Sequence, residues 1–254
     1  MTSEKTTDME VLTADHHKLS CRHFQTGHDN VVILSHGFFN NKDAYLFRKM
    51  AEELSRRHDV LSFDFRGHGK SSGLFSFTSL ETEDLRAVVA YAKSRAYRSI
   101  GVIGFSLGAA VAIIEGSRNT DIRSIISVSS PCDFWKIDYR FWEKEMLEDL
   151  KLNLGVKGKG KGIRPGNPFL PKVRPIDVAR KIAPRPILFI HGRQDWLIHP
   201  VHSAKLYRKA KQPKKLALVD RAGHAEKIYD ANPEEFIKMC SDWFGETLKE
   251  GVPV

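Results

Sequence analysis

The sequence is poor in cysteine and has no long apolar run. Its three cysteines, Cys21, Cys132 and Cys240, are an odd and widely spaced set, which predicts neither a disulfide framework nor a metal site. No apolar run approaches the roughly 20 residues that a membrane-spanning helix needs. The opening MTSEKTTDME lacks the basic segment and apolar core of a secretion signal. We therefore expect a cytoplasmic chain with no stable membrane insertion.

The positive charge is concentrated in one segment. The net charge of the chain is +9, and residues 136–185 hold 13 basic and 6 acidic side chains. The run GVKGKGKGIR has no aromatic residues between its lysines and resembles no nucleic-acid-binding module, so no nucleic-acid partner is expected. Two interpretations stay open: a solvated loop, or a surface for an anionic substrate or an acidic membrane.

Short apolar runs alternate with amphipathic stretches. The runs predict strands at 31–35, 60–65, 99–103, 122–128, 186–190 and 216–219, and helical spacing predicts helices at 45–57, 80–95, 107–117, 204–211 and 233–248. This alternation indicates a mostly parallel sheet with helices on both faces. The sequence thus predicts a single α/β domain over residues 1–254.

The segment at about 133–185 interrupts the alternation. Its first part is aromatic with helical spacing, and its second part is rich in glycine, lysine and proline. We expect a small cap inserted over the strand ends. Phe134, Trp135 and Trp142 could contact a substrate from this cap, or pack the cap helix onto the domain.

The stretch GFSLG, residues 104–108, places a serine between two glycines at a predicted strand-to-helix junction. Such a turn is strained, needs room on both sides, and exposes the Ser106 hydroxyl as a nucleophile. The alternative is a serine that merely opens a helix. The strand before the motif and the helix after it favour the nucleophile.

A nucleophilic serine needs a base, and the base needs an acid to orient it. In this kind of turn the chain order is serine, acid, histidine. Asp195 follows the fifth predicted strand and His224 follows the sixth, so both fit the order. We expect Ser106, Asp195 and His224 to form a catalytic triad.

Other residues compete for these roles. Asp133 follows the fourth strand and could be the acid. His191, His199 and His202 flank Asp195, but none follows the last strand, so surface or loop-packing roles are expected for them. His199 and His202 have a metal-like spacing without further ligands, and no metal site is predicted.

An oxyanion intermediate needs backbone N–H donors. The amides of Leu107, after the serine, and Phe38, in HGFFN after the first predicted strand, are the candidates. The alternative for residues 36–40 is a simple strand-ending turn. Phe39 and Trp196 lie next to these loops and are candidate substrate contacts.

From about residue 31 to residue 248, the chain resembles the α/β-hydrolase superfamily. The matching pieces are HGFFNNKD, DFRGHGKSSG, GFSLG, GRQDWLIHP and AGHAE. The resemblance is to small serine esterases with a short cap, and it implies the Ser106 triad and no cofactor. It also implies that Asp64, Arg66 and His68 belong to a structural turn. The activities of relatives that use an aspartate nucleophile are not expected, because Ser106 stands at that position.

The predicted function is hydrolysis of carboxylic esters with small to medium acyl chains, through an acyl-enzyme. A thioesterase, a monoacylglycerol-type lipase, a peptidase and a carbon–carbon bond hydrolase share this chemistry and stay open. A non-catalytic receptor of the same fold is an alternative of another class, disfavoured by the complete triad. The expected partner is a small-molecule ester or thioester. The oligomeric state is left open.

Overall fold

One mixed sheet organises the computed structural model, which describes residues 5–137, 144 and 163–249. Within these ranges eight strands pair in the order β1-β2-β4-β3-β5-β6-β7-β8. All strands from β3 to β8 run parallel, and β1 and β2 are antiparallel. The strands are β1 (Lys5–Leu12), β2 (Lys18–Gln25), β3 (Asn30–Ser35), β4 (Asp59–Phe63), β5 (Ser99–Phe105), β6 (Ile122–Val128), β7 (Ile187–Gly192) and β8 (Lys214–Val219). The predicted, mostly parallel α/β architecture is confirmed.

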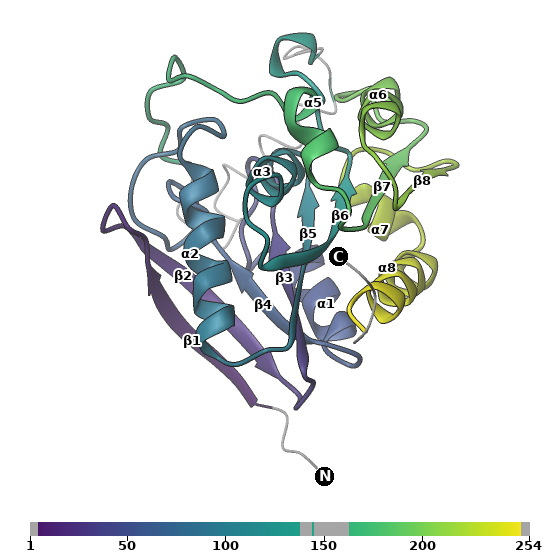
Figure 1. Ribbon diagram of the computed structural model, residues 1–254. Helices are drawn as coiled ribbons and strands as arrows, with labels where there is room; N and C mark the ends of the chain where they lie inside the picture. Colours follow the sequence, from purple (N-terminus) through teal and green to yellow (C-terminus); the bar gives the residue numbers. More distant parts are fainter. Residues whose placement is uncertain (1–4, 138–143, 145–162, 250–254) are drawn as a thin grey trace.

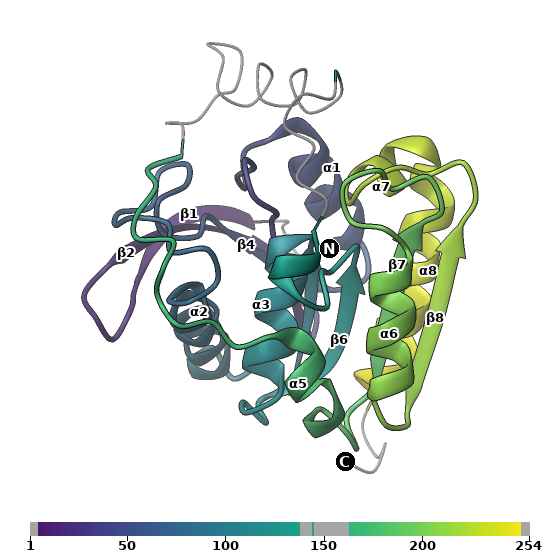
Figure 2. The ribbon, with the colours of Figure 1, turned by 90° about the horizontal axis from the view of Figure 1, so that it is seen from above.

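Helices cover both faces of this sheet (Figure 1). Seen from above, α2, α3, α5 and α6 lie on one side, and α1, α7 and α8 lie on the other (Figure 2). Their bounds are α1 (Tyr45–Leu54), α2 (Glu81–Ser94), α3 (Leu107–Gly116), α5 (Pro175–Val178), α6 (Val201–Lys209), α7 (Lys227–Ala231) and α8 (Pro233–Thr247). In the described part of the chain, no helix combines the length and apolarity that crossing a bilayer requires.

Two apolar cores, one on each face of the sheet, explain why the central strands are continuous apolar runs in the sequence. Along β3, Val31 and Ile33 belong to the core that includes α2 and α3. Val32 and Leu34 belong to the core that includes α1 and α8. Successive side chains of a strand point to opposite faces. A strand covered on both faces therefore needs apolar residues throughout, each contributing roughly 1.5–3 kcal/mol when fully buried.

The first two strands, β1 and β2, are absent from the sequence prediction. In β1 only Val11 is buried, and in β2 buried and partly exposed residues alternate. These strands form an antiparallel edge of the sheet, and exposed or half-buried positions predominate in β1. The apolar signal there is accordingly too weak to mark a strand.

The structure describes only the ends of the expected cap at 133–185. A 3-10 turn, η1 (Phe134–Lys136), follows β6 closely. Arg164 and Gly166 then donate backbone hydrogen bonds to the loop between β4 and α2. Further on, α5 packs against α3 and α6. Residues 138–143 and 145–162, with Trp142 and the glycine-lysine run, lie outside the described residues.

Candidate active site

Ser106 connects the end of β5 to the first turn of α3. Its backbone has φ 51° and ψ −113°, a conformation that costs a non-glycine residue about 1–3 kcal/mol. The neighbouring glycines make it possible. A Cβ on Gly104 would lie 2.4 Å from Gly108 O, and one on Gly108 would lie 2.4 Å from His36 O. The Ser106 N–H donates to Val128 O (2.8 Å), which fixes the turn at the carboxyl edge of the sheet.

His224 lies on the loop between β8 and α7. Its Nε2 is 2.9 Å from Ser106 Oγ, and its Nδ1 is 2.8 Å from Asp195 Oδ2. An ionised carboxylate only accepts, so Nδ1 carries the proton and Nε2 of the neutral ring accepts from the serine hydroxyl. The loop is held in turn by the Ala225 N–H, which donates to Ser129 Oγ (3.1 Å). This arrangement allows the ring to take a proton from Ser106.

Asp195 is placed by the loop that follows β7, and its side chain is fully buried. Its Oδ1 accepts from the backbone N–H groups of Leu197 (3.1 Å) and Ile198 (2.9 Å). Burial acts to raise the pKa of Asp195. The charge of protonated His224 and hydrogen bonds from His191 and His224 outweigh burial and hold this pKa well below its ordinary value. The carboxylate therefore stays ionised.

The other candidate acid and bases have different partners. Asp133 caps η1 with its side chain and lies 3.4 Å from Arg174. His202 binds the backbone of residues 132–136 through both ring nitrogens, and His199 is exposed. Among the residues that the structure describes, no three His, Cys, Asp or Glu side chains group as a metal site requires.

His191 lies closer to Asp195 than the sequence suggests. Of the surface and loop-packing roles expected for it, the first is wrong: the side chain is fully buried, and Nε2 lies 3.1 Å from Asp195 Oδ2. No sequence pattern signals this contact, because it depends on how the loop after β7 folds back.

The loop after β3 brings the Phe38 peptide to the serine. A Cβ on Gly37 would lie 3.3 Å from Ser106 Cβ. The His36 ring donates from Nδ1 to Gly37 O (2.7 Å) and accepts at Nε2 from the Phe65 N–H (3.1 Å). Burial lowers the pKa of His36 to about 4, so the ring is neutral. In a trans peptide the C=O and N–H point apart, so the Phe38 N–H points away from His36.

The second candidate donor is the amide of Leu107, the first residue of α3. An amide at this position has no partner inside its own helix and lies at the positive end of the helix dipole. The loop that carries Phe38 is tied to the histidine loop, because Asn40 Nδ2 donates to Glu226 Oε1 (2.9 Å). Both amides therefore lie on segments that are anchored around Ser106.

Aromatic rings gather beside the Phe38 loop. The ring of Phe38 stacks on Phe75, with centroids 5.0 Å apart, and Phe75 contacts Phe77 at 4.6 Å. Phe39, a predicted substrate contact, is half-buried against Phe38 with a ring separation of 3.9 Å. Sequence reasoning missed Phe75 and Phe77, which follow a turn without any motif of their own.

The other predicted substrate contacts are spread out. Trp196 directly follows Asp195 and is half-buried. In η1, Phe134 is half-buried, whereas Trp135 is 89% exposed. Trp142 lies outside the described residues. Phe39 and Trp196 are thus half-buried chain neighbours of candidate site residues, and Trp135 faces solvent.

The turn DFRGHGKSSG is a network of buried polar contacts. Asp64 accepts from the Lys42 N–H (2.7 Å), and Arg66 pairs with Asp84 (2.7 Å). The buried His68 has a pKa lowered to about 3 by burial and donates from Nδ1 to Arg66 O (3.1 Å). These contacts occupy the side chains of Asp64 and Arg66 inside the domain, whereas His68 Nε2 is buried without a hydrogen-bond partner among the described residues.

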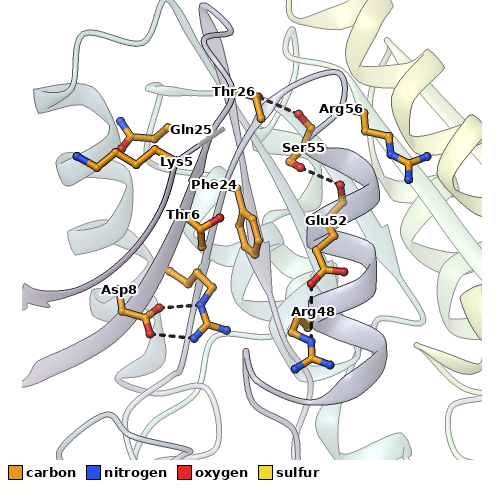
Figure 3. A pocket seen from close by; sticks show the side chains of 11 residues that line it. Lys5, Thr6, Asp8, Phe24, Gln25, Thr26, Arg48, Glu52, Ser55 and Arg56 are labelled. Atoms are coloured by element: carbon orange, nitrogen blue, oxygen red, sulfur yellow. Dashed lines mark hydrogen bonds and ion pairs between the residues drawn. The ribbon is translucent and has the colours of Figure 1, made fainter. Parts of the chain in front are cut away.

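A separate cavity of about 670 Å³ opens between β1, β2 and α1 (Figure 3). Because β2 is antiparallel to β4, its wall residue Phe24 pairs with Val60 near the start of β4. The cavity therefore lies toward the amino edge of the parallel strands, opposite Ser106. Arg22 in its wall is paired with Asp8 (2.7 Å). This cavity is not part of the candidate active site.

Comparisons with known proteins agree with this fold. Residues 30–161 match the family model described as the alpha/beta hydrolase fold. The uncharacterized protein YqkD of Bacillus subtilis is 28% identical over 240 residues, which are 84% of this chain and 72% of that protein. The uncharacterized protein YfhR of Escherichia coli K12 is 27% identical over 223 residues, 85% of this chain and 70% of that one.

Among solved structures, the esterase Pf2001 of Pyrococcus furiosus superposes with a TM-score of 0.79 at 27% identity, over 98% of this chain and 95% of that one. DcsB, in complex with a substrate analogue, superposes with a TM-score of 0.84 at 15% identity, over 96% of this chain and 100% of that one. The latter likeness shows the fold alone. The chain belongs to the α/β-hydrolase family, and its fold and esterase relatives place it among the hydrolases.

Proposed function

We propose that the protein is a serine hydrolase that cleaves carboxylic esters of small to medium acyl chains through an acyl-enzyme intermediate. One observation carries the proposal: the His224 ring lies between Ser106 Oγ (2.9 Å) and Asp195 Oδ2 (2.8 Å). The backbone conformation of Ser106 and the bare glycines on both sides support it.

In the proposed reaction, Ser106 Oγ attacks the acyl carbonyl while His224 Nε2 accepts its proton. Asp195, which stays ionised, holds Nδ1–H and stabilises the imidazolium that forms. The N–H groups of Phe38 and Leu107 stabilise the oxyanion, and each such donor contributes roughly 3 kcal/mol in related chemistry. His224 then protonates the leaving group, and water activated by the same ring releases the acid.

The substrate is proposed to be a small-molecule ester or thioester, with no nucleic-acid partner and no stable membrane insertion. The apolar rings of Phe38, Phe75 and Phe77 beside the oxyanion loop support a site for an acyl or aryl group. Phe39 and Trp196 are proposed to line it. We keep the cap at about 133–185, with Phe134, Trp135 and Trp142, as part of this proposal.

The test measures hydrolysis of p-nitrophenyl esters from acetate to palmitate, together with labelling by a fluorophosphonate. Ser106→Ala is compared with Ser117→Ala, which changes a serine just beyond the other end of the same helix. We expect turnover that peaks at one chain length, and labelling that only Ser106→Ala abolishes.

Labelling without ester turnover would redirect the proposal to thioesters, peptides or carbon–carbon bonds. If the folded wild type neither turned over nor was labelled, the serine-hydrolase proposal would be wrong, and a non-catalytic receptor would replace it.

A further inference from the structure

The chain of polar contacts that begins at Ser106 does not end at Asp195. His191 Nε2 lies 3.1 Å from Asp195 Oδ2, the same oxygen that His224 Nδ1 contacts. The other ring nitrogen of His191, Nδ1, lies 2.6 Å from Ser203 Oγ of α6. Asp195 Oδ2 thus lies beside two histidines, and each histidine contacts a serine hydroxyl with its other ring nitrogen.

The surroundings of His191 decide where its proton lies. Nε2 faces two atoms that only accept: Asp195 Oδ2 at 3.1 Å and Ile198 O at 2.6 Å. Nε2 must therefore carry a proton. The shorter contact is the hydrogen bond to Ile198 O, and the carboxylate oxygen lies beside the same N–H. Ser203 Oγ is the partner of Nδ1.

These contacts close a ring around the acid. Asp195 Oδ1 accepts from the Ile198 N–H (2.9 Å), and the carbonyl of that residue accepts from His191. The loop that positions Asp195 is therefore held by a buried side chain that also touches the carboxylate. Among the described residues, the titratable groups that face the His191 ring are Asp195, on the loop that follows β7, and His202 on α6. His224 lies beyond Asp195.

We propose that His191, held by Ser203, is a positioning residue that fixes the Asp195 carboxylate for His224. The proposal rests on the serine-hydrolase function proposed above. The N–H of His191 shares the negative charge of Oδ2 with His224, and its hydrogen bond to Ile198 fixes the loop. Losing this N–H leaves the carboxylate less well oriented and concentrates its charge on His224.

The experiment compares His191→Leu, which removes the N–H, with His191→Gln, whose amide can place an N–H at the Nε2 position. For His191→Leu we expect kcat to fall about 10-fold or more, with KM changed by less than about 2-fold. The acid limb of the kcat/KM profile should move to higher pH by about half a unit. His191→Gln should recover most of both losses.

His58→Leu and His58→Gln form the matched control. His58 is also buried, and its ring binds Asn30 Oδ1 (2.7 Å) just before the start of β4, at the opposite edge of the sheet. This pair should lower the melting temperature without moving the pH profile. The proposal would be overturned if the two His191 variants also lowered the melting temperature without moving the pH profile. It would equally be overturned if His191→Leu and His191→Gln had the same pH profile.

Two further measurements keep the test decisive. If His191→Leu does not fold, Ser203→Ala takes its place, because it removes only the Nδ1 partner; a profile identical to the wild type would then count against the proposal. The proton NMR resonance of His224 Nδ1–H should shift in His191→Leu and return in His191→Gln. This measurement needs no turnover. An inactive wild type would therefore refute the proposed function, and the resonance would still test the positioning role of His191.

Discussion

Two serines at neighbouring strand ends have nearly the same positive φ angle, and their hydroxyl groups have different partners. Ser106 follows β5 with φ 51°, and Ser129 follows β6 with φ 50°. Each N–H donates to the next strand, to Val128 O (2.8 Å) and to Ile190 O (2.9 Å) respectively. Yet Ser106 Oγ faces the His224 ring, whereas Ser129 Oγ accepts from the Ala225 N–H (3.1 Å).

The comparison teaches that a strained strand end does not by itself make a nucleophile. The same histidine loop supplies an imidazole to one hydroxyl and a backbone amide to the other. A serine hydroxyl becomes a reactive nucleophile only beside a base. The partner of the hydroxyl therefore decides whether the serine can act as a nucleophile. Ser129 instead helps to hold the loop that carries His224.

The strongest test of this comparison removes each hydroxyl in turn. Ser106→Ala should lower kcat/KM by about 10⁴-fold or more, because it removes the nucleophile. Ser129→Ala should lower it by less than about 10-fold, because it frees one backbone amide of the histidine loop. Steady-state kinetics on the best ester measures both. Equal losses would show that Ser129 has more than a supporting role.

The acid that orients the base is the next test. Asp195→Asn offers an amide to His224 Nδ1 and favours the wrong tautomer, so we expect a loss of about 10³–10⁴-fold in kcat. Asp133→Asn, at the rival carboxylate, should change kcat by less than about 3-fold, since Asp133 caps η1 and contacts Arg174 rather than a histidine beside Ser106. The reverse result would transfer the acid role to Asp133.

The glycines beside Ser106 allow a test by stability. Gly104→Ala should destabilise the fold by roughly 3 kcal/mol or more, because its Cβ would lie 2.4 Å from Gly108 O. Gly245→Ala is the matched control in α8, where a Cβ meets nothing within 4 Å, and it should stabilise by about 0.5–1 kcal/mol. Denaturant unfolding gives both values. A tolerated Gly104→Ala would contradict the packing described for this turn.

The smallest predicted effect is on the pH dependence of stability, and it comes from the buried His58. Burial lowers the pKa of His58 to about 4, against about 6.5 in an unfolded chain. The unfolded state therefore binds a proton between these values that the folded state does not, and stability falls as the pH falls from about 6.5 to about 4.

Between pH 7 and pH 5, His58→Gln should accordingly lose about 2 kcal/mol less stability than the wild type. Urea unfolding at the two pH values measures this difference. His199→Gln, at an exposed position, should behave as the wild type. A His58→Gln protein with the pH dependence of the wild type would show that His58 is not held neutral.

Much of this fold was predictable from the sequence, because its central strands are covered on both faces. Such strands are continuous apolar runs, as around Val32 and Ile103. The order of Ser106, Asp195 and His224 along the chain was predictable too, and these residues lie together. The strands β1 and β2 escaped because an edge with few buried residues carries little apolar pattern.

The neighbours of the candidate site were not predicted, for another reason. His191, Phe75 and Phe77 contact the site region through loop paths that no local spacing encodes. A sequence pattern identifies residues that must follow a strand, but the direction of a side chain within a loop depends on tertiary packing.

The strand that precedes His224, β8, has consequences for resistance to heat. Among the strands that the structure describes, it is the last of the sheet and pairs only with β7, and its residues are half-buried or exposed. Edge elements of this kind open at lower free-energy cost than central strands. Inactivation by warming should therefore begin at this edge, with the imidazole withdrawn from Ser106 while β3 and β5 still hold together.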